Sequence, residues 1–273
     1  MNSEMEHTVV LELAYDGAPF SGFARQPGQL TVQGSLEDAL GLLYGRLIET
    51  TCAGRTDAGV HALGQVVSFD LSAAEFQARP LTAMARSLNA LVDEHIAVKR
   101  AWEAAHGFSA RFDAVAREYR YFIYEGPERA VLVANRVWHL KRELDIEALA
   151  AAAAHLVGEH DFKSFCLAVS AKGKPTCRNI VEITIDRERL LGERVVVVKV
   201  IGNAFLHSMV RTIVGTLVAV GTGRRDPSWI AEVLAACDRQ AAGENAPANG
   251  LVFWHVDYGE AEPKTGREED CRV

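Results

Sequence analysis

Residues 46–71 read RLIETTCAGRTDAGVHALGQVVSFDL, and they contain two partly apolar segments on either side of a polar, glycine-bounded stretch. Segments 46–52 and 64–71 favour strands on both sides of a polar loop. Gly54 and Gly59 bound that loop, and glycine permits tight bends and close approach of other groups to the backbone. We therefore expect a strand–loop–strand unit that displays the polar side chains between the two glycines.

Outward from this unit, the neighbouring segments predict an alternation of strands and helices. A strand at 9–15 and an amphipathic helix at 32–44 precede the loop, and a helix opened by Pro80 and a strand at 96–102 follow it. This order, β-α-β-β-α-β, is typical of the ferredoxin-like or split-βαβ fold. The second half has a similar order, with strands expected at 117–125, 133–140, 179–188, 194–201 and 251–258 and helices at 145–158, 205–221 and 226–238.

The expected fold is α+β, with two ferredoxin-like, RRM-like halves that form one extended, mainly antiparallel sheet with a central active-site cleft. We divide the chain into an N-terminal α/β half at 1–106, which carries the loop, and a C-terminal α/β half at 107–260. Gly158 is a good C-cap for the first helix of the second half, and Pro227 suits the first position of its last helix. The charged residues 261–273 are expected to form a disordered tail.

Composition narrows the class of protein. With 273 residues, 49% of them hydrophobic, the chain can bury a core, and five cysteines without CxxC spacing indicate reduced thiols in the cytoplasm. Nine histidines show no HExxH spacing and no nucleotide-binding loop is visible, so we expect neither a metal nor a cofactor. Charged residues interrupt the most apolar region, so we expect no membrane segment. The net charge of −7 argues mildly against nucleic acid, although a local basic surface would suffice.

Two groups of polar residues are candidates for function. In the loop, Arg55 and Asp57 indicate either a turn with a solvated ion pair or a displayed catalytic carboxylate. Arg211 lies on the shoulder of an apolar helical stripe, where a guanidinium either extends to water or pairs with an acid, and Asp57 is the best candidate for that acid. In the first strand of the second half, Tyr119 shares a face with Arg117, which suits either base stacking and phosphate binding or ordinary core packing.

The segment CAGRTDAGVHALGQV resembles the signature loop of the tRNA pseudouridine synthase A family. The resemblance covers almost the whole chain, through LAYDGAPFSGFARQ, TVQGSLEDAL, FSARFDAVAREYRYFIY, GEHDFKSF, CRNI, NAFLHSMVRTIVG and GLVFWHVDY, in the family's order. It implies two ferredoxin-like halves around a cleft, a homodimer, and an isomerase that needs no cofactor or metal. The substrate that it implies is uridine at positions 38–40 in the anticodon stem-loop of tRNA.

The resemblance also implies roles for residues of this chain. Asp57 would be the catalytic group, Tyr119 the active-site tyrosine, and Arg55 and Arg211 the arginines beside the acid. Contacts with tRNA are expected from Tyr119, Arg25, Gln26, Arg111, Lys174 and Arg178.

Two segments depart from the family's pattern. Phe23 stands where the family usually has tryptophan, and residues 173–177 read GKPTC where an Arg-Thr-Pro run is usual before Arg178. Both segments are expected to lie in loops that contact RNA, so the departures concern tRNA binding rather than the chemistry.

Isomerising uridine requires that its C–N glycosidic bond break and that the sugar rejoin the base at C5. One ionised carboxylate can promote this at ribose C1′, at uracil C6, or by stabilising the sugar intermediate. The base must leave its stack, so the pocket must accept a flipped nucleotide. A retaining glycosidase would need a second carboxylate near Asp57, and none stands out. The other alternative is a non-catalytic RNA-binding module of the same fold, which the presence of Asp57, Tyr119 and Arg211 disfavours.

Overall fold

The computed structural model describes residues 5–167 and 172–261, so the tail beyond 261, which we expected to be disordered, lies outside the described residues. The first half contains β1 (Met5–Tyr15), α1 (Val32–Tyr44), β2 (Thr51–Cys52), β3 (His61–Ser72), α2 (Ala73–Ala78), α3 (Leu81–Leu91) and β4 (Ile96–Ala104). The second half contains β5 (Ala116–Glu125), β6 (Trp138–Leu140), α4 (Ile146–Ala154), β7 (Gly158–Asp161), β8 (Cys177–Leu190), β9 (Glu193–Gly202), α6 (Met209–Gly221), α7 (Trp229–Ala236) and β10 (Leu251–Asp257). The first half thus keeps the predicted β-α-β-β-α-β order, with the short helix α2 added.

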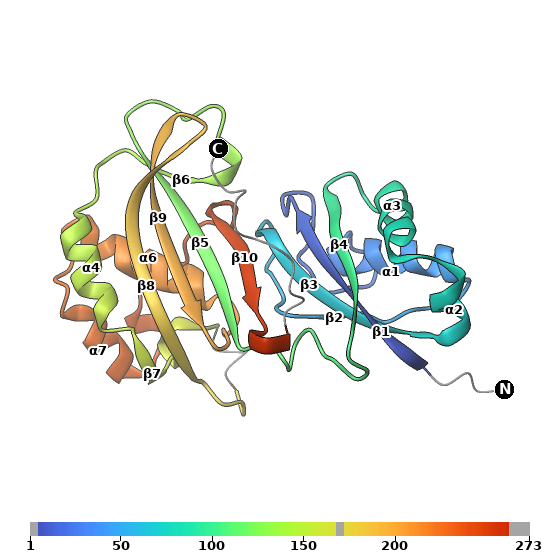
Figure 1. The fold of residues 1–273 in the computed structure, drawn as a ribbon. Coiled ribbons are helices and arrows are strands. Elements are labelled where there is room, and N and C mark those ends of the chain that lie inside the picture. Colours follow the sequence, from blue (N-terminus) through green and yellow to red (C-terminus); the bar gives the residue numbers. More distant parts are fainter. Residues whose placement is uncertain (1–4, 168–171, 262–273) are drawn as a thin grey trace.

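The ten strands of the described residues belong to one sheet. Its neighbours run β4-β1-β3-β10-β5-β9-β8-β7, while β2 pairs with β3 and β6 pairs with β5. Most pairs are antiparallel, and the pairs of β10 with β3 and of β5 with β6 are parallel. Figure 1 shows α1, α2 and α3 gathered at one end of the sheet and α4, α6 and α7 at the other. The predicted class, α+β with one extended and mainly antiparallel sheet, is confirmed.

β10 comes late in the chain but lies in the middle of the sheet, between β3 and β5, where it joins the two halves (Figure 1). Its residue Phe253 is paired with Ala62 of β3 on one side and with Tyr119 of β5 on the other. Because Ala62 is the second residue of β3 and the loop at 53–60 ends directly before that strand, this pairing brings the loop close to Tyr119. Candidate residues from both halves therefore meet at this junction.

Most buried apolar residues form one main cluster, which runs through both halves, from Val9 on β1 to Ile230 on α7. A smaller cluster, which includes Phe122, lies on the opposite face of the sheet. Phe23 is fully buried in the main cluster, with its ring centroid 6.2 Å from that of Tyr15. Phe23 is thus a core residue rather than an RNA contact, and its replacement of the larger tryptophan changes packing instead.

The structure corrects two boundaries that the sequence pattern placed wrongly. The strand expected at 46–52 is reduced to β2, because the backbone N–H of Thr50 donates to the side chain of Glu37 instead of a neighbouring strand. The helix expected to run to Gly158 ends at Ala154, and Gly158 instead opens β7 with a φ of 104°.

Two helices of the second half also begin later than expected. Pro227 precedes α7, which starts at Trp229, because the first N–H groups of this segment bond to carbonyls three residues earlier in a tighter turn. The helix expected at 205–221 starts only at Met209. The reason is that Ser208 has a left-handed backbone, with φ 58° and ψ 13°, which a right-handed helix cannot include.

Candidate active site

The loop between β2 and β3 turns sharply around Asp57. The N–H of Val60 donates to the Asp57 carbonyl (3.1 Å), and Gly59 has a φ of 79°, a conformation that favours glycine. A Cβ on Gly54 would lie 2.9 Å from the ring of Phe253, so glycine is also needed for close approach there. The Asp57 side chain is 21% exposed, so it is held by the protein yet remains accessible.

Two hydrogen-bond donors and one histidine converge on the Asp57 carboxylate. Oδ2 accepts hydrogen bonds from the Ser208 hydroxyl (2.7 Å) and from Nη1 of Arg211 (3.1 Å). Nε2 of His207 lies 3.2 Å from Oδ1. Arg211 is itself oriented by a bond from its Nε to the carbonyl of Ala246 (2.8 Å). The predicted pairing of Arg211 with Asp57 is therefore confirmed.

Buried groups of β1 and β3 hold the backbone of the loop. Gln65 is fully buried and donates to the carbonyl of Gly54 (2.6 Å). The hydroxyls of Tyr15 and Thr56 are hydrogen-bonded (2.8 Å), and the N–H of Phe23 donates to the Thr56 carbonyl (3.0 Å). Burial raises the pKa of Tyr15, so its hydroxyl stays neutral. The sheet thus fixes the position of the loop.

Arg117 is a buried guanidinium that has no carboxylate partner among the described residues. Its five N–H groups all donate to backbone carbonyls, those of Ala53, Arg111, Ala114 and Asn203. Burial lowers the pKa of Arg117. The sequence left two roles open for this face of β5, RNA binding and core packing. Arg117 has the second role, because its guanidinium is bonded within the protein. It ties the loop to the segment that leads into α6.

Tyr119 is a buried aromatic wall at the junction of the halves. Its ring meets those of Phe205 and Phe253 edge-on, at centroid distances of 5.0 and 4.9 Å. Burial raises the pKa of Tyr119, and the nearby Tyr15 and Asp57 add to the rise. Within the described residues its hydroxyl has no hydrogen-bond partner. Tyr119 is thus a neutral phenol at physiological pH.

Three further arginines have different surroundings. Arg55 and Arg111 are exposed, and the guanidinium of Arg111 lies 5.3 Å from the ring centroid of Phe112. Arg178, at the start of β8, donates to the carbonyls of Pro175 and Cys177, at 3.1 and 2.6 Å. Lys174, in the loop that precedes β8, is exposed. Contact of these residues with RNA stays a prediction.

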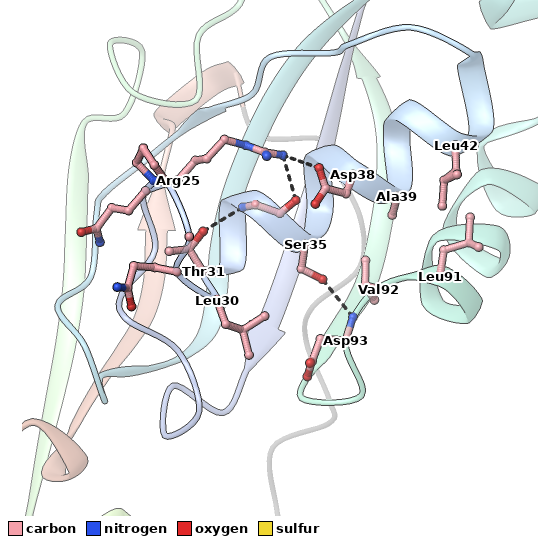
Figure 2. Close-up of a pocket in the computed structure, with 15 residues that line it drawn as sticks. Arg25, Leu30, Thr31, Ser35, Asp38, Ala39, Leu42, Leu91, Val92 and Asp93 are labelled. Carbon is pink, nitrogen blue, oxygen red and sulfur yellow. Dashed lines mark hydrogen bonds and ion pairs between the residues drawn. The ribbon is translucent and has the colours of Figure 1, made fainter.

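A groove of about 820 Å³ lies between α1, the loop at 25–31 and the segment at 91–93 (Figure 2). Its lining includes Arg25 and Gln26, which we expected to bind RNA, but not Asp57. The exposed leucines of its lining are Leu30, Leu42 and Leu91. The groove is therefore a feature of the first half that is separate from the carboxylate site.

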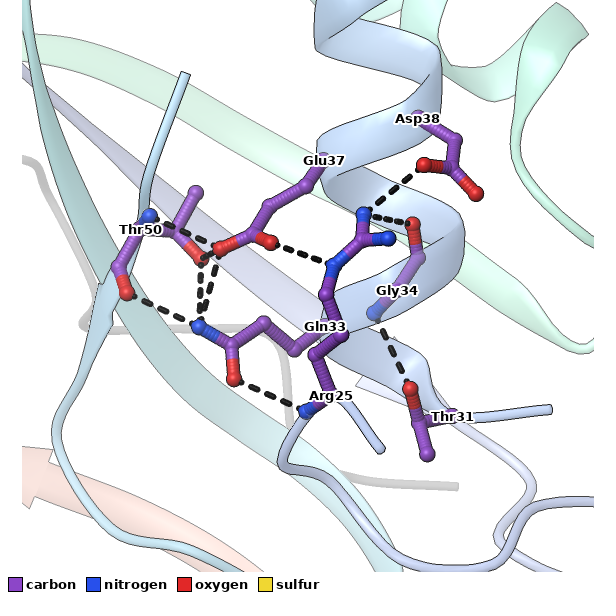
Figure 3. Close-up of polar contacts among 7 residues, drawn as sticks. All are labelled: Arg25, Thr31, Gln33, Gly34, Glu37, Asp38 and Thr50. Carbon is purple, nitrogen blue, oxygen red and sulfur yellow. Dashed lines mark hydrogen bonds and ion pairs between the residues drawn. The ribbon is translucent and has the colours of Figure 1, made fainter. Parts of the chain in front are cut away.

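Acidic side chains hold Arg25 at the edge of this groove (Figure 3). Its Nη2 donates to Asp38 and its Nε to Glu37, both at 2.8 Å, and these bonds raise the pKa of Arg25. Gln26 donates to the carbonyl of Ser21 (3.0 Å). Two carboxylates on one guanidinium leave no excess positive charge at this point, so RNA contact by Arg25 and Gln26 stays a prediction.

Glu37 links the loop that contains Arg25 to the segment that leads into the candidate site. Its buried carboxylate accepts hydrogen bonds from Arg25, from Gln33 and twice from Thr50 (Figure 3). Glu37→Gln is expected to lower the free energy of unfolding by about 2 kcal/mol, because the new amide NH₂ would face one of these donors. Asp38→Asn is the matched control, since Asp38 is 73% exposed and its loss should cost less than about 0.5 kcal/mol. Urea denaturation measures both, and equal losses would contradict the expectation.

His61, the first residue of β3, is a buried link between the halves. Its Nδ1 accepts from the N–H of Gly17 (3.1 Å), and its Nε2 lies 3.1 Å from the carbonyl of Asn135, to which the neutral ring donates. Burial lowers the pKa of His61, and the nearby Arg136 lowers it further, so the ring is neutral at physiological pH. His61 therefore supports the loop rather than supplying a charge.

Sequence reasoning missed several contributors to the site. Ser208 and His207 stand directly before α6, and the only sequence signal for them is their closeness to Arg211. Gln65 is a polar residue inside an apolar strand, which only weakly indicates that its side chain bonds to the loop. Arg117 shares a predicted strand face with Tyr119, but its carbonyl partners are separated widely along the chain, so no local pattern predicts them.

None of the helices described for this chain combines the length and apolarity needed to traverse a bilayer. In the same part of the chain, His, Cys, Asp and Glu side chains form no cluster of three or more that could hold a metal ion. The cysteines that the structure describes, Cys52, Cys166, Cys177 and Cys237, are unpaired.

Comparison with known proteins gives concordant matches. A family model described as tRNA pseudouridine synthase matches residues 13–113 and 152–259. A protein of Brevibacillus brevis named tRNA pseudouridine synthase A is 44% identical over 246 residues, covering 90% of this chain and 97% of that protein. The protein of the same name from Frankia casuarinae is 44% identical over 268 residues, covering 96% of this chain and 93% of that protein.

Among solved structures, a chain in the crystal structure of a Cbf5-Nop10-Gar1 complex is similar with a TM-score of 0.37 and 14% identity, over 78% of this chain and 45% of that chain. The sequence matches are much closer and span most of the chain. They show that this chain belongs to the tRNA pseudouridine synthase family, and pseudouridine synthases are isomerases.

Proposed function

We propose that this protein isomerises uridine to pseudouridine at positions 38–40 in the anticodon stem-loop of tRNA, with Asp57 as the catalytic group. The observation that carries the proposal is the convergence of hydrogen bonds from Ser208 and Arg211 on the Asp57 carboxylate, with His207 beside it. Fixed donors around an accessible carboxylate suit a group that acts in its charged form. Family membership supports the class of reaction.

In the reaction, the bond between N1 and C1′ breaks and a bond between C5 and C1′ forms. The proton on C5 is released and N1 gains one, so the product is an isomer and no oxidant or reductant is needed. Asp57 can act on C1′, on C6, or as the counter-charge of the sugar. Each route requires that the carboxylate be held in a fixed orientation against the nucleotide, and Arg211 and Ser208 supply that restraint.

We place the flipped base against Tyr119. A ring fixed by Phe205 and Phe253 presents a rigid stacking surface, which offsets part of the stacking that the base loses on leaving the RNA. The neutral hydroxyl can donate a hydrogen bond to the base or pass on the proton from C5.

Tyr119→Phe keeps the ring and removes only the hydroxyl. We expect the rate at saturating tRNA to fall by roughly 10²-fold, the lower end of the range for a group that handles protons. Stability should change by less than about 1 kcal/mol, because the hydroxyl has no partner among the described residues.

Tyr121→Phe is the matched control for this variant. The Tyr121 hydroxyl donates to the carbonyl of Pro247 (2.8 Å), so its loss should cost about 1 kcal/mol of stability and leave the rate unchanged. Single-turnover assays and thermal unfolding separate the two effects. A Tyr119→Phe enzyme with the parental rate would exclude a role for the hydroxyl.

We further propose that basic loops bind the tRNA, with Arg55 beside the acid and with Arg25, Gln26, Arg111 and Arg178 on the phosphates. Two copies would form a homodimer in the cytoplasm, one holding the body of the tRNA while the other modifies the stem-loop. Binding should weaken steeply with salt, because lysine and arginine displace counterions from RNA. Light scattering at micromolar concentration distinguishes dimer from monomer, and a fully active monomer would remove the dimer from the proposal.

Incubation with an unmodified tRNA, followed by mapping of pseudouridine position by position, tests the proposed function. The product should appear at 38–40, and a transcript with cytidine at these positions should stay unmodified. Pseudouridine only at other positions would contradict the proposed site. Binding without any product would favour the alternative, a non-catalytic RNA-binding module of the same fold.

A further inference from the structure

Ser208 has a backbone conformation that residues other than glycine seldom adopt, with φ 58° and ψ 13°. Among the described residues, Leu191 and Cys237 share a positive φ. Leu191 lies in the tight turn between β8 and β9, and Cys237 ends α7, places where such a backbone is common. Ser208 instead precedes a helix, so its conformation needs a different explanation.

The hydroxyl of Ser208 is directed to Asp57 rather than to its own helix. A serine at the start of a helix ordinarily accepts a hydrogen bond from a free N–H of the first turn. Here the side chain makes no capping bond, and its Oγ donates to Oδ2 of Asp57 at 2.7 Å. The left-handed backbone therefore coincides with a hydroxyl that serves the carboxylate.

We propose that Ser208 is a positioning residue for the isomerisation, an inference that rests on the proposed catalytic role of Asp57. Ser208 and Arg211 both donate to Oδ2, and two donors on one oxygen fix the rotation of the carboxylate. Oδ1 accepts neither of these bonds, so we expect it to be the oxygen that faces the nucleotide. Nε2 of His207 lies 3.2 Å from Oδ1, and this side chain, which is 50% exposed, has to move aside when the nucleotide enters.

Two variants separate the hydroxyl from the backbone. Ser208→Ala removes the hydroxyl and keeps a Cβ on the left-handed backbone, whereas Ser208→Gly removes the hydroxyl and relieves the strain. The glycine variant should therefore have the higher Tm of the two. Both should lose about tenfold or more in single-turnover rate, while the Kd for tRNA stays at the parental value. Thr222→Ala is the control, because it deletes a hydroxyl that donates to Val218 at the other end of α6 (2.7 Å) and should keep the parental rate.

The outcomes distinguish this inference from the proposed function. Parental rates in both Ser208 variants would overturn it, as would a parental rate in Ser208→Gly alone, which would show that backbone shape was all that mattered. A higher Kd with an unchanged rate would also overturn it, because Ser208 would then be an RNA contact. Asp57→Asn is assayed beside them. If it is inactive while the Ser208 variants are parental, only the role of Ser208 fails, whereas an active Asp57→Asn enzyme overturns both.

Discussion

Replacing Asp57 with asparagine is expected to lower the single-turnover rate of pseudouridine formation by roughly 10⁴-fold or more, the scale of loss when an enzyme loses a catalytic group. The amide has nearly the shape of the carboxylate but lacks its charge. Its carbonyl oxygen can still accept from Ser208 and Arg211, so the loop should keep its place. Release of tritium from C5 of uridine measures the rate, because that proton leaves when C5 joins the sugar.

Two measurements show whether the Asp57→Asn effect is confined to the chemistry. The Kd for tRNA and the Tm should both stay near the parental values. Asp38→Asn makes the same chemical change at a 73% exposed aspartate and should keep the parental rate. An Asp57→Asn enzyme that keeps a substantial part of the parental rate would remove Asp57 from the catalytic role.

The second large effect is expected at Arg211. Arg211→Met keeps an unbranched apolar stem on the helix but removes the guanidinium, which leaves Asp57 with Ser208 and the half-exposed His207. We expect the rate at saturating tRNA to fall roughly 10²- to 10³-fold, as when one fixed donor is lost from an active site. Arg211→Lys should fall less, by about tenfold, because it keeps the charge but loses the bond from Nε to Ala246.

A matched control for Arg211 is available near the same helix. Arg224→Met removes an exposed guanidinium that lies 4.0 Å from Glu244, so neither the rate nor the Kd for tRNA should change. Thermal unfolding of all three variants shows whether the fold is kept. Parental rates in Arg211→Met would mean that the ion pair with Asp57 serves stability alone.

Much of this arrangement was predictable from local patterns in the sequence. Alternation in the strands and the amphipathic pattern of α1 predicted the order of elements in the first half. The apolar stripe of α6 predicted the pairing of Arg211 with Asp57, because a guanidinium at the edge of a buried face needs an acid. The glycines around Asp57 indicated the tight loop, and the structure places Gly54 against Phe253 as close approach requires.

The remainder depends on contacts between distant parts of the chain. Pairing of β10 with β3 joins residues separated by most of the sequence, and no local period reports it. The left-handed backbone of Ser208 cannot be read from the residue type, since serine rarely adopts it. Arg25 belongs to a segment that the family resemblance assigned to RNA contact. Its acidic partners, Glu37 and Asp38, come from the following helix and meet Arg25 only because the loop folds onto α1.

We propose Asp57 as the group with which this protein converts uridine to pseudouridine in tRNA. The most direct test incubates one unmodified tRNA with an excess of parental enzyme or of Asp57→Asn, at concentrations that saturate binding, and maps pseudouridine at each position. We expect pseudouridine at 38–40 with the parental enzyme and an unmodified tRNA with Asp57→Asn. Equal modification by both proteins, or none by the parental enzyme on bound tRNA, would contradict it.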